Sequence, residues 1–137
     1  MGRILAIDYG KKRCGIAVTD PLRMIASPLE TVKTESLYTF LQGYTDREEV
    51  DVIVFGMPTD LKSRDTHITA DVRKSMDKCR TKFPEIQIDA IDERFTSKIA
   101  FDSMIAGGLG KKKRADKERL DKVSAAVILQ SYLEQNS

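Results

Sequence analysis

With 137 residues and a net charge of +2, the chain is long enough for a domain with a buried core and too weakly charged to indicate a nucleic-acid partner on charge alone. We expect a single domain over residues 1–137. No apolar run approaches the length of a membrane span and Met1 opens no signal-peptide pattern, so we expect a cytoplasmic protein with no membrane partner. Cys14 and Cys79 are isolated and the one histidine, His67, lies in a polar stretch, so we expect buried thiols, a surface histidine and no zinc site.

The start of the chain predicts a meander of three strands. Ile4–Ile7 is a continuous apolar run, typical of a strand buried on both faces, and Asp8 follows at its carboxyl end, where α/β sheets bind ligands. Residues 14–19 predict a second strand. After an Asp-Pro turn, residues 24–32 predict a third strand, antiparallel to the second. Its Pro28 places it at the sheet edge, because proline cannot donate to a ladder.

The rest of the chain alternates helices and strands. Residues 34–49 have apolar positions at helical spacing, and residues 51–56 are a second continuous apolar run, which the helical crossover makes parallel to the first strand. We expect an amphipathic helix over residues 65–83, stopped by Pro84, and an alternating strand over residues 86–90. A short helix over residues 97–106 and a last helix over residues 116–135 should follow. We therefore expect an α/β fold, with a five-stranded mixed sheet in the order 3-2-1-4-5 and helices on both faces.

In this strand order, acidic residues meet at one edge of the sheet. The first and fifth strands flank the fourth, so their carboxyl ends, at Asp8 and at Asp92-Glu93, are about 9.5 Å apart. Gly56, at the end of the fourth strand, leaves room between them. Because a glutamate spans this gap better than an aspartate, we favour Glu93 over Asp92 as the partner of Asp8.

Asp121 supplies a third acid, on the otherwise apolar face of the last helix. A charge directed toward a sheet is costly unless it is paired or binds a metal, although Asp121 could instead pair with Lys117 or face solvent at the helix start. Three carboxylates at one edge demand a cation, and oxygen ligands without nearby His or Cys favour Mg²⁺ or Mn²⁺. We therefore expect Asp8, Glu93 and Asp121 to be metal ligands and catalytic residues in phosphodiester hydrolysis.

Basic residues accompany each of the three acids. Runs of charge are usually solvated, but this placement favours contacts with the phosphate backbone of a nucleic acid. The candidate nucleic-acid-binding residues are Lys11, Lys12, Arg13, Arg94, Lys111, Lys112, Lys113 and Arg114.

Four segments, in order along nearly the whole chain, carry a family resemblance: residues 7–20, 55–58, 92–97 and 121–129. They resemble the YqgF family of RNase H-like proteins, which are related in fold to the RuvC Holliday junction resolvases. The resemblance implies a cytoplasmic bacterial nuclease that matures the 5′ end of pre-16S rRNA during ribosome assembly, with Asp8, Glu93 and Asp121 at the metal-site positions. The loop at residues 59–63 departs from the family pattern, so we assign it no substrate role.

Other functions are compatible with parts of this pattern. The same site could cut four-way DNA junctions, which only a substrate panel would distinguish from RNA cleavage. An actin- or sugar-kinase-like ATPase shares the core. Such an enzyme clamps its nucleotide between two domains of this type, which the one short domain expected here cannot do. A non-catalytic RNA-binding factor acting on ribosome assembly intermediates is a third alternative, and the absence of an aromatic stacking platform counts mildly against it.

Overall fold

The computed structural model describes residues 2–57, 67–92 and 117–136, with the backbone alone for residues 67 and 117–121. Its elements, in chain order, are β1 (Arg3–Tyr9), β2 (Arg13–Thr19), β3 (Ala26–Lys33), the 3₁₀ turn η1 (Thr34–Ser36), α1 (Leu37–Arg47), β4 (Val50–Met57), α2 (His67–Lys82), β5 (Gln87–Asp92) and α5 (Lys117–Gln135). In the described ranges, no helix is both long enough and apolar enough to cross a membrane.

The five strands form one mixed sheet in the order β3-β2-β1-β4-β5, as the sequence predicts. β1, β4 and β5 are parallel, because helices connect them, and β2 and β3 are antiparallel to their neighbours. The edge position of β3 is also confirmed, and its Pro28 lies beside a register shift in the pairing with β2. The carboxyl ends of β1, β4 and β5 therefore meet at one edge of the sheet.

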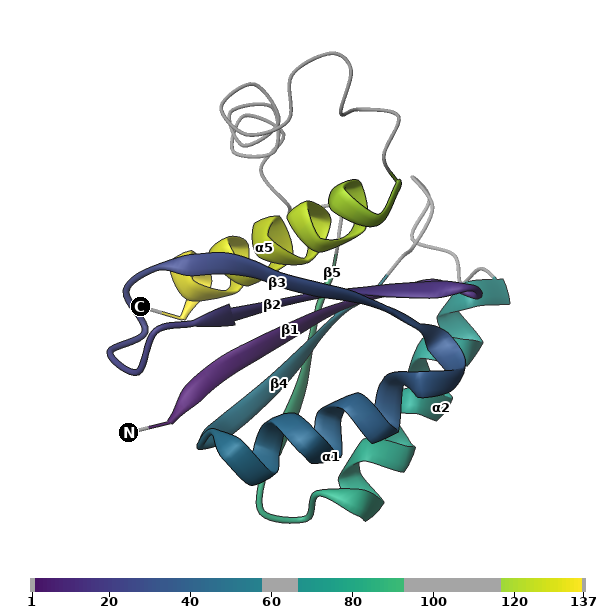
Figure 1. Ribbon diagram of the computed structural model, residues 1–137, viewed down its shortest axis with the longest axis horizontal. Coiled ribbons are helices and arrows are strands. Elements are labelled where there is room, and N and C mark those ends of the chain that lie inside the picture. Colours follow the sequence, from purple (N-terminus) through teal and green to yellow (C-terminus); the bar gives the residue numbers. More distant parts are fainter. Residues whose placement is uncertain (1, 58–66, 93–116, 137) are drawn as a thin grey trace.

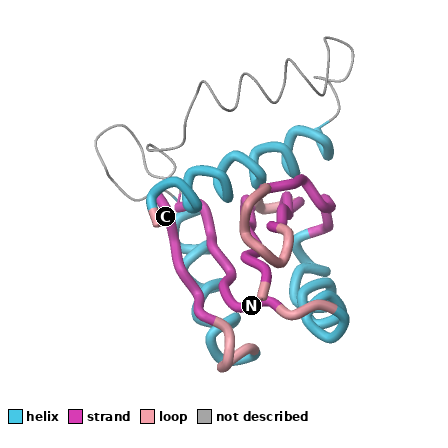
Figure 2. The backbone as a smooth tube through the Cα atoms, turned by 90° about the vertical axis from the view of Figure 1, so that its left-hand side faces the viewer, coloured by secondary structure: helices cyan, strands magenta, loops and turns pink. Residues whose placement is uncertain are grey.

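Helices cover both faces of the sheet (Figures 1 and 2), which confirms the predicted layers. α1 and α2 pack on one face, where the predicted stripe of α2 contributes Val72, Met76 and Cys79 to the core. α5 packs on the other face through small and branched side chains, including Ala125 and Ile128. Both cysteines are buried, as expected. The surface position expected for the His67 side chain lies outside what the structure describes.

Two element boundaries differ from the sequence prediction. β3 begins at Ala26 rather than at residue 24, because the amides of Ile25 and Met24 each donate to the Asp20 carboxylate at 2.8 Å and so leave the ladder. These hydrogen bonds lower the pKa of Asp20, and the one from the Ile25 amide contributes most. The helix expected over residues 34–49 is divided into η1 and α1. The short helix expected over residues 97–106 lies outside the described residues.

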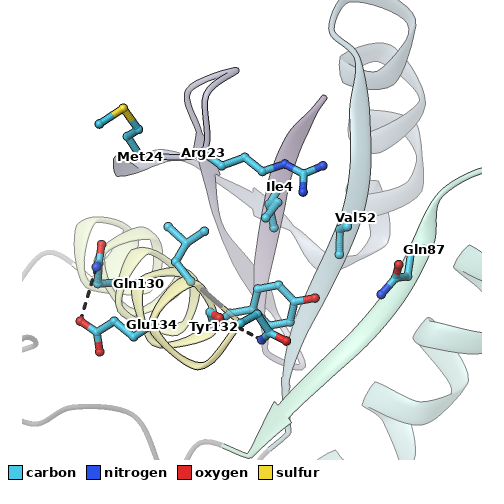
Figure 3. Close-up of a pocket in the computed structure, with 10 residues that line it drawn as sticks. Ile4, Arg23, Met24, Val52, Gln87, Gln130, Tyr132 and Glu134 are labelled. Atoms are coloured by element: carbon cyan, nitrogen blue, oxygen red, sulfur yellow. Dashed lines mark hydrogen bonds between the residues drawn. The ribbon is translucent and has the colours of Figure 1, made fainter. Parts of the chain in front are cut away.

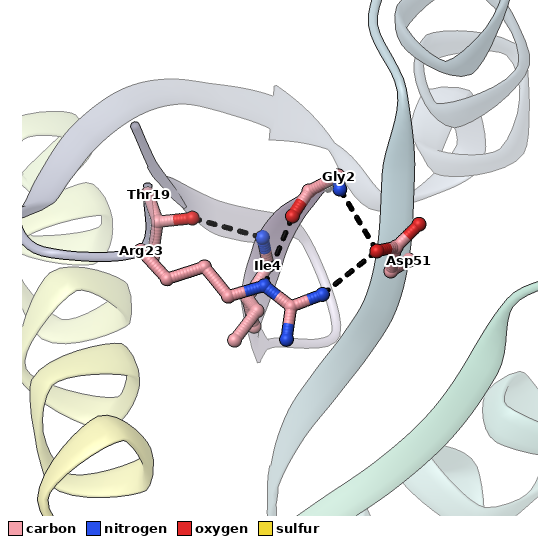
Figure 4. A network of polar contacts seen from close by, with 5 residues as sticks. All are labelled: Gly2, Ile4, Thr19, Arg23 and Asp51. Carbon is pink, nitrogen blue, oxygen red and sulfur yellow. Dashed lines mark hydrogen bonds and ion pairs between the residues drawn. The ribbon is translucent and has the colours of Figure 1, made fainter. Parts of the chain in front are cut away.

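Polar contacts fix the amino-terminal end of β1 to its neighbours (Figure 4). The Asp51 carboxylate accepts hydrogen bonds from the Gly2 amide at 2.8 Å and from the Arg23 guanidinium at 2.7 Å. Arg23 also donates to the Gly2 carbonyl, and the Ile4 amide donates to the Thr19 hydroxyl. The end of the sheet that lies away from Asp8 is thus held by contacts between β1, the β2–β3 turn and β4.

A cavity of about 510 Å³ lies at this same end (Figure 3). It lies between the starts of β1, β4 and β5 and the last turns of α5, with Ile4, Val52, Gln87 and Tyr132 in its wall. The predicted site residues whose side chains the structure describes, Asp8, Lys11, Lys12 and Arg13, are not among its lining residues. The two ends of the sheet therefore differ, and the predicted site belongs to the opposite one.

Candidate active site

Asp8 lies near the carboxyl end of β1, flanked by a glycine on each neighbouring strand. It pairs with Gly15 of β2, and the pairing of Ile7 with Phe55 makes Gly56 its neighbour on β4. Side chains alternate along a strand, so Asp8 shares the α5 face with Ile4 and Ala6. The Asp8 side chain is partly exposed. Both glycines are buried, and neither adds a side chain beside this carboxylate.

The β1–β2 turn that follows Asp8 is tied to the start of η1. The Thr34 hydroxyl donates to the Gly10 carbonyl at 2.6 Å, and the Thr34 amide donates to the Lys12 carbonyl at 3.0 Å. A Cβ atom on Gly10 would lie 2.5 Å from the Arg13 carbonyl oxygen, so the turn closes tightly only with glycine here. The basic residues of the turn therefore have a fixed backbone next to the acid.

The sheet order places β5 two strands away from β1, about 9.5 Å, as the sequence analysis assumes. Asp92, the last residue of β5, pairs with Met57 of β4. By alternation it shares the side of Ile88, whose neighbours are α1 and α2, whereas Asp8 lies on the α5 side. Asp92 therefore faces away from Asp8. Glu93 follows it and lies outside the described residues.

α5 runs back along β1, from the carboxyl end of the strand to its start (Figure 1). Near the end of α5, Tyr132 lines the same cavity as Ile4, at the start of β1, and its hydroxyl donates to Asp89 of β5. Asp121 is eleven residues earlier, about 16 Å along the helix, while Asp8 is about 13 Å beyond Ile4. The backbone of Asp121 thus lies at the level of Asp8, one turn before the buried Ala125.

Burial also determines the ionisation of the residues that anchor this helix and the core. The pKa of Tyr132 is raised to about 12, first by burial and then by its hydrogen bond to the Asp89 carboxylate. Burial likewise raises the pKa of Cys79 to about 12. Tyr132 therefore stays a neutral donor at physiological pH and keeps the α5–β5 contact.

The described residues include only part of the predicted site. Asp8 is fully described, Asp121 by its backbone alone, and Glu93 lies outside. Of the predicted cations, Lys11 and Lys12 are exposed, Arg13 is partly exposed, and Arg94 and Lys111–Arg114 lie outside. Within the described residues, no group of three or more acids, cysteines or histidines is placed to hold a metal ion.

The structure brings two residues to this edge that the sequence analysis missed. Gly15 lies directly beside Asp8, and Lys33, at the end of β3, pairs with Arg13. Both pairings follow from the antiparallel register of β1, β2 and β3. This register can be obtained by pairing residues outward from each of the two turns of the meander. The meander and the helical crossover are enough to order the strands, whereas the pairs of individual residues depend on the register.

Comparison with known proteins identifies relatives over nearly the whole chain. A family model described as "RuvX: Holliday junction resolvase" matches residues 2–135. The chain is 51% identical to a protein of Amoebophilus asiaticus over 97% of this chain and 94% of that protein. It is 48% identical to a protein of Porphyromonas gingivalis, over 98% of this chain and 97% of that one. Both relatives carry the name "Putative pre-16S rRNA nuclease".

Proposed function

Because the chain belongs to the RuvX family of Holliday junction resolvases, we propose that it is a nuclease that hydrolyses a phosphodiester bond in the 5′ region of pre-16S rRNA. The names of its relatives support an RNA substrate, and the family description supports junction DNA as the alternative. The match to the family model confirms the family resemblance found in the sequence. We place the protein in the cytoplasm, acting on ribosome assembly intermediates.

The observation that carries this proposal is the position of Asp8. Its carboxylate lies at the carboxyl end of a central strand, between Gly15 and Gly56, and beside the basic β1–β2 turn. Open α/β sheets bind ligands at this edge, and the two glycines leave space for a phosphate close to the acid. Lys11, Lys12 and Arg13 would hold the substrate backbone there through sequence-independent contacts.

We propose that Asp8, Glu93 and Asp121 together hold Mg²⁺ or Mn²⁺. The donor set fits such an ion, because it consists only of carboxylate oxygens, the ligands that hard divalent cations prefer. When bound, the ion supplies an activated water and charge stabilisation for the departing oxygen. The direction of α5 supports the inclusion of Asp121, and the orientation of Asp92 away from Asp8 supports Glu93 as the ligand from β5.

The residues themselves then have separate roles. Asp8 and its two partner acids fix the geometry of the charged centre, since each comes from a different element of the fold. The cations of the turn orient the phosphate so that the scissile bond lies beside the Asp8 carboxylate. Arg94 and Lys111–Arg114, which follow or precede the other acids in the sequence, would contact phosphates further along the strand.

The test is cleavage of a pre-16S rRNA fragment and of a four-way DNA junction, each with Mg²⁺, Mn²⁺ or EDTA. We expect cleavage of the RNA with either metal and none with EDTA. Asp8→Asn, Glu93→Gln and Asp121→Asn should each abolish cleavage without lowering the melting temperature, because each relieves repulsion among the acids. Asp92→Asn is the matched control and should keep cleavage.

The outcomes separate the alternatives. Cleavage of the junction but not of the RNA would identify junction DNA as the substrate. Full cleavage by Asp8→Asn would refute the proposed mechanism, in which Asp8 is a catalytic residue. RNA binding without cleavage, and with equal affinity in all three variants, would favour the non-catalytic assembly factor.

A further inference from the structure

A basic groove of about 720 Å³ lies beside the β1–β2 turn, at the edge of the sheet formed by β3. Its lining residues come from the turn, from the end of β3 and from η1: Lys11, Lys12, Arg13, Thr31, Val32, Lys33 and Glu35. Four of the seven are cations and one is an acid. We call this feature the β3-edge groove. Its dominant charge suits an anionic ligand.

The strand register connects this groove with Asp8. Asp8 pairs with Gly15, and Gly15 pairs with Thr31, so the three residues form a row across β1, β2 and β3. Residues paired across a sheet share a face, so Thr31 lies on the same face as Asp8, about 9.5 Å away. Gly15, between them, is buried, because α5 packs on this face. Arg13 and Lys33 are the pair two residues further along on that face.

The pairing of Arg13 with Lys33 places two cations opposite each other on neighbouring strands. Like charges directly opposite each other on neighbouring strands destabilise a sheet. A lysine on an edge strand commonly prevents edge-to-edge association, which would account for Lys33 alone. It does not account for an arginine opposite it and for Lys11 and Lys12 in the same groove. A bound anion would interact favourably with all four cations.

We propose that the β3-edge groove binds the phosphate backbone of the nucleic-acid substrate, on the side of Asp8 away from β4 and β5. The inference deepens the proposed function and rests on it for the identity of the substrate. The substrate strand would pass from Asp8 along the β1–β2 turn to Arg13 and Lys33. Lysine, arginine and threonine side chains all contact phosphate oxygens, and among the described residues no aromatic side chain lines the groove to stack on a base. The groove therefore holds the backbone without reading its sequence.

The test measures binding of a fluorescent single-stranded RNA from the 5′ region of pre-16S rRNA, in EDTA, over a series of salt concentrations. The variants are Lys33→Gln and Lys33→Arg, with Lys74→Gln as the matched control. Lys74 is exposed on α2, which packs on the opposite face of the sheet. Lys33→Gln should lower the slope of log affinity against log salt by about 0.7, the value of one phosphate contact on a single strand. Lys33→Arg should keep the slope of the unmodified protein.

Two further measurements separate binding from stability. Lys33→Gln should melt at the same temperature as the unmodified protein or higher, because it removes the repulsion from Arg13. Glu35→Gln should increase affinity, since it removes the one acid of the groove. Equal salt slopes for Lys33→Gln and Lys74→Gln would overturn the proposal.

The binding and cleavage assays test the groove and the nuclease proposal separately. If Lys33→Gln changes the salt slope but no protein cleaves RNA, the groove stands and the nuclease proposal falls. If cleavage depends on Asp8 while Lys33→Gln binds as the control does, the nuclease proposal stands and the groove is refuted.

Discussion

Replacing Gly10 with alanine should destabilise the protein, and the structure gives the size of the effect. The new Cβ would lie 2.5 Å from the Arg13 carbonyl oxygen, well inside the usual contact distance. That oxygen belongs to the backbone of a turn which Thr34 holds by two hydrogen bonds, so it has little freedom to move. Overpacking of this kind costs roughly 1–3 kcal/mol. For a chain of this size, each kcal/mol lowers the melting temperature by about 3–5 °C.

The matched control is the same substitution in a helix. Gly43 lies within α1, and nothing is within 4 Å of the Cβ that alanine would add. Gly43→Ala should therefore stabilise the protein by about 0.5–1 kcal/mol, because alanine loses less backbone entropy in a helix. The assay is thermal unfolding of both variants under identical conditions, together with RNA cleavage. A melting temperature for Gly10→Ala equal to or above that of the unmodified protein would refute the reasoning about the turn.

Further predictions concern the basic loop, the thiols and alkaline pH. Serine at all four positions Lys111–Arg114 should weaken RNA binding equally across sequences and lower the salt slope by up to about 0.7 per lost contact on single strands; an unchanged slope would remove this segment from the binding surface. Cys14 and Cys79 should react with a thiol reagent at pH 8 only on unfolding, because both are buried and the pKa of Cys79 is about 12; rapid labelling of the native protein would contradict this. Stability should fall as the pH rises from about 10 to about 12, because Tyr132 ionises in the unfolded chain first. Tyr132→Phe should weaken that dependence, measured by denaturant unfolding at several pH values.

The sheet order could be predicted because its signals are local and independent. Continuous apolar runs identify β1 and β4 as buried, and Pro28 identifies β3 as an edge strand. The helical crossover then fixes the parallel direction of β4. The stripe of α2 was equally clear, since its apolar residues recur at helical spacing over four turns and Pro84 stops them. That residues 1–137 form a single domain stays a prediction.

Boundaries and neighbours at the site were harder to predict, because they depend on side-chain hydrogen bonds. Asp20 accepts hydrogen bonds from the amides of Met24 and Ile25 and thereby shortens β3, although Ile25 favours a strand. Thr34 donates hydrogen bonds to the β1–β2 turn and lies at the start of the 3₁₀ turn η1. The position of Asp8 was predicted correctly from its strand, whereas the pairing of Lys33 with Arg13 depends on residue-level register.

The contact between Tyr132 and Asp89 has a consequence for communication along α5. This hydrogen bond fixes the far end of a 19-residue helix to β5, and Asp121 lies near the other end of the same helix. Because a helix moves largely as a rigid rod, a small tilt at Tyr132 is carried to Asp121 about 16 Å away. Substitutions around the cavity at the start of the sheet should therefore alter the metal affinity of the proposed site without touching its ligands. Selection of random variants for altered cleavage should therefore recover substitutions at this cavity.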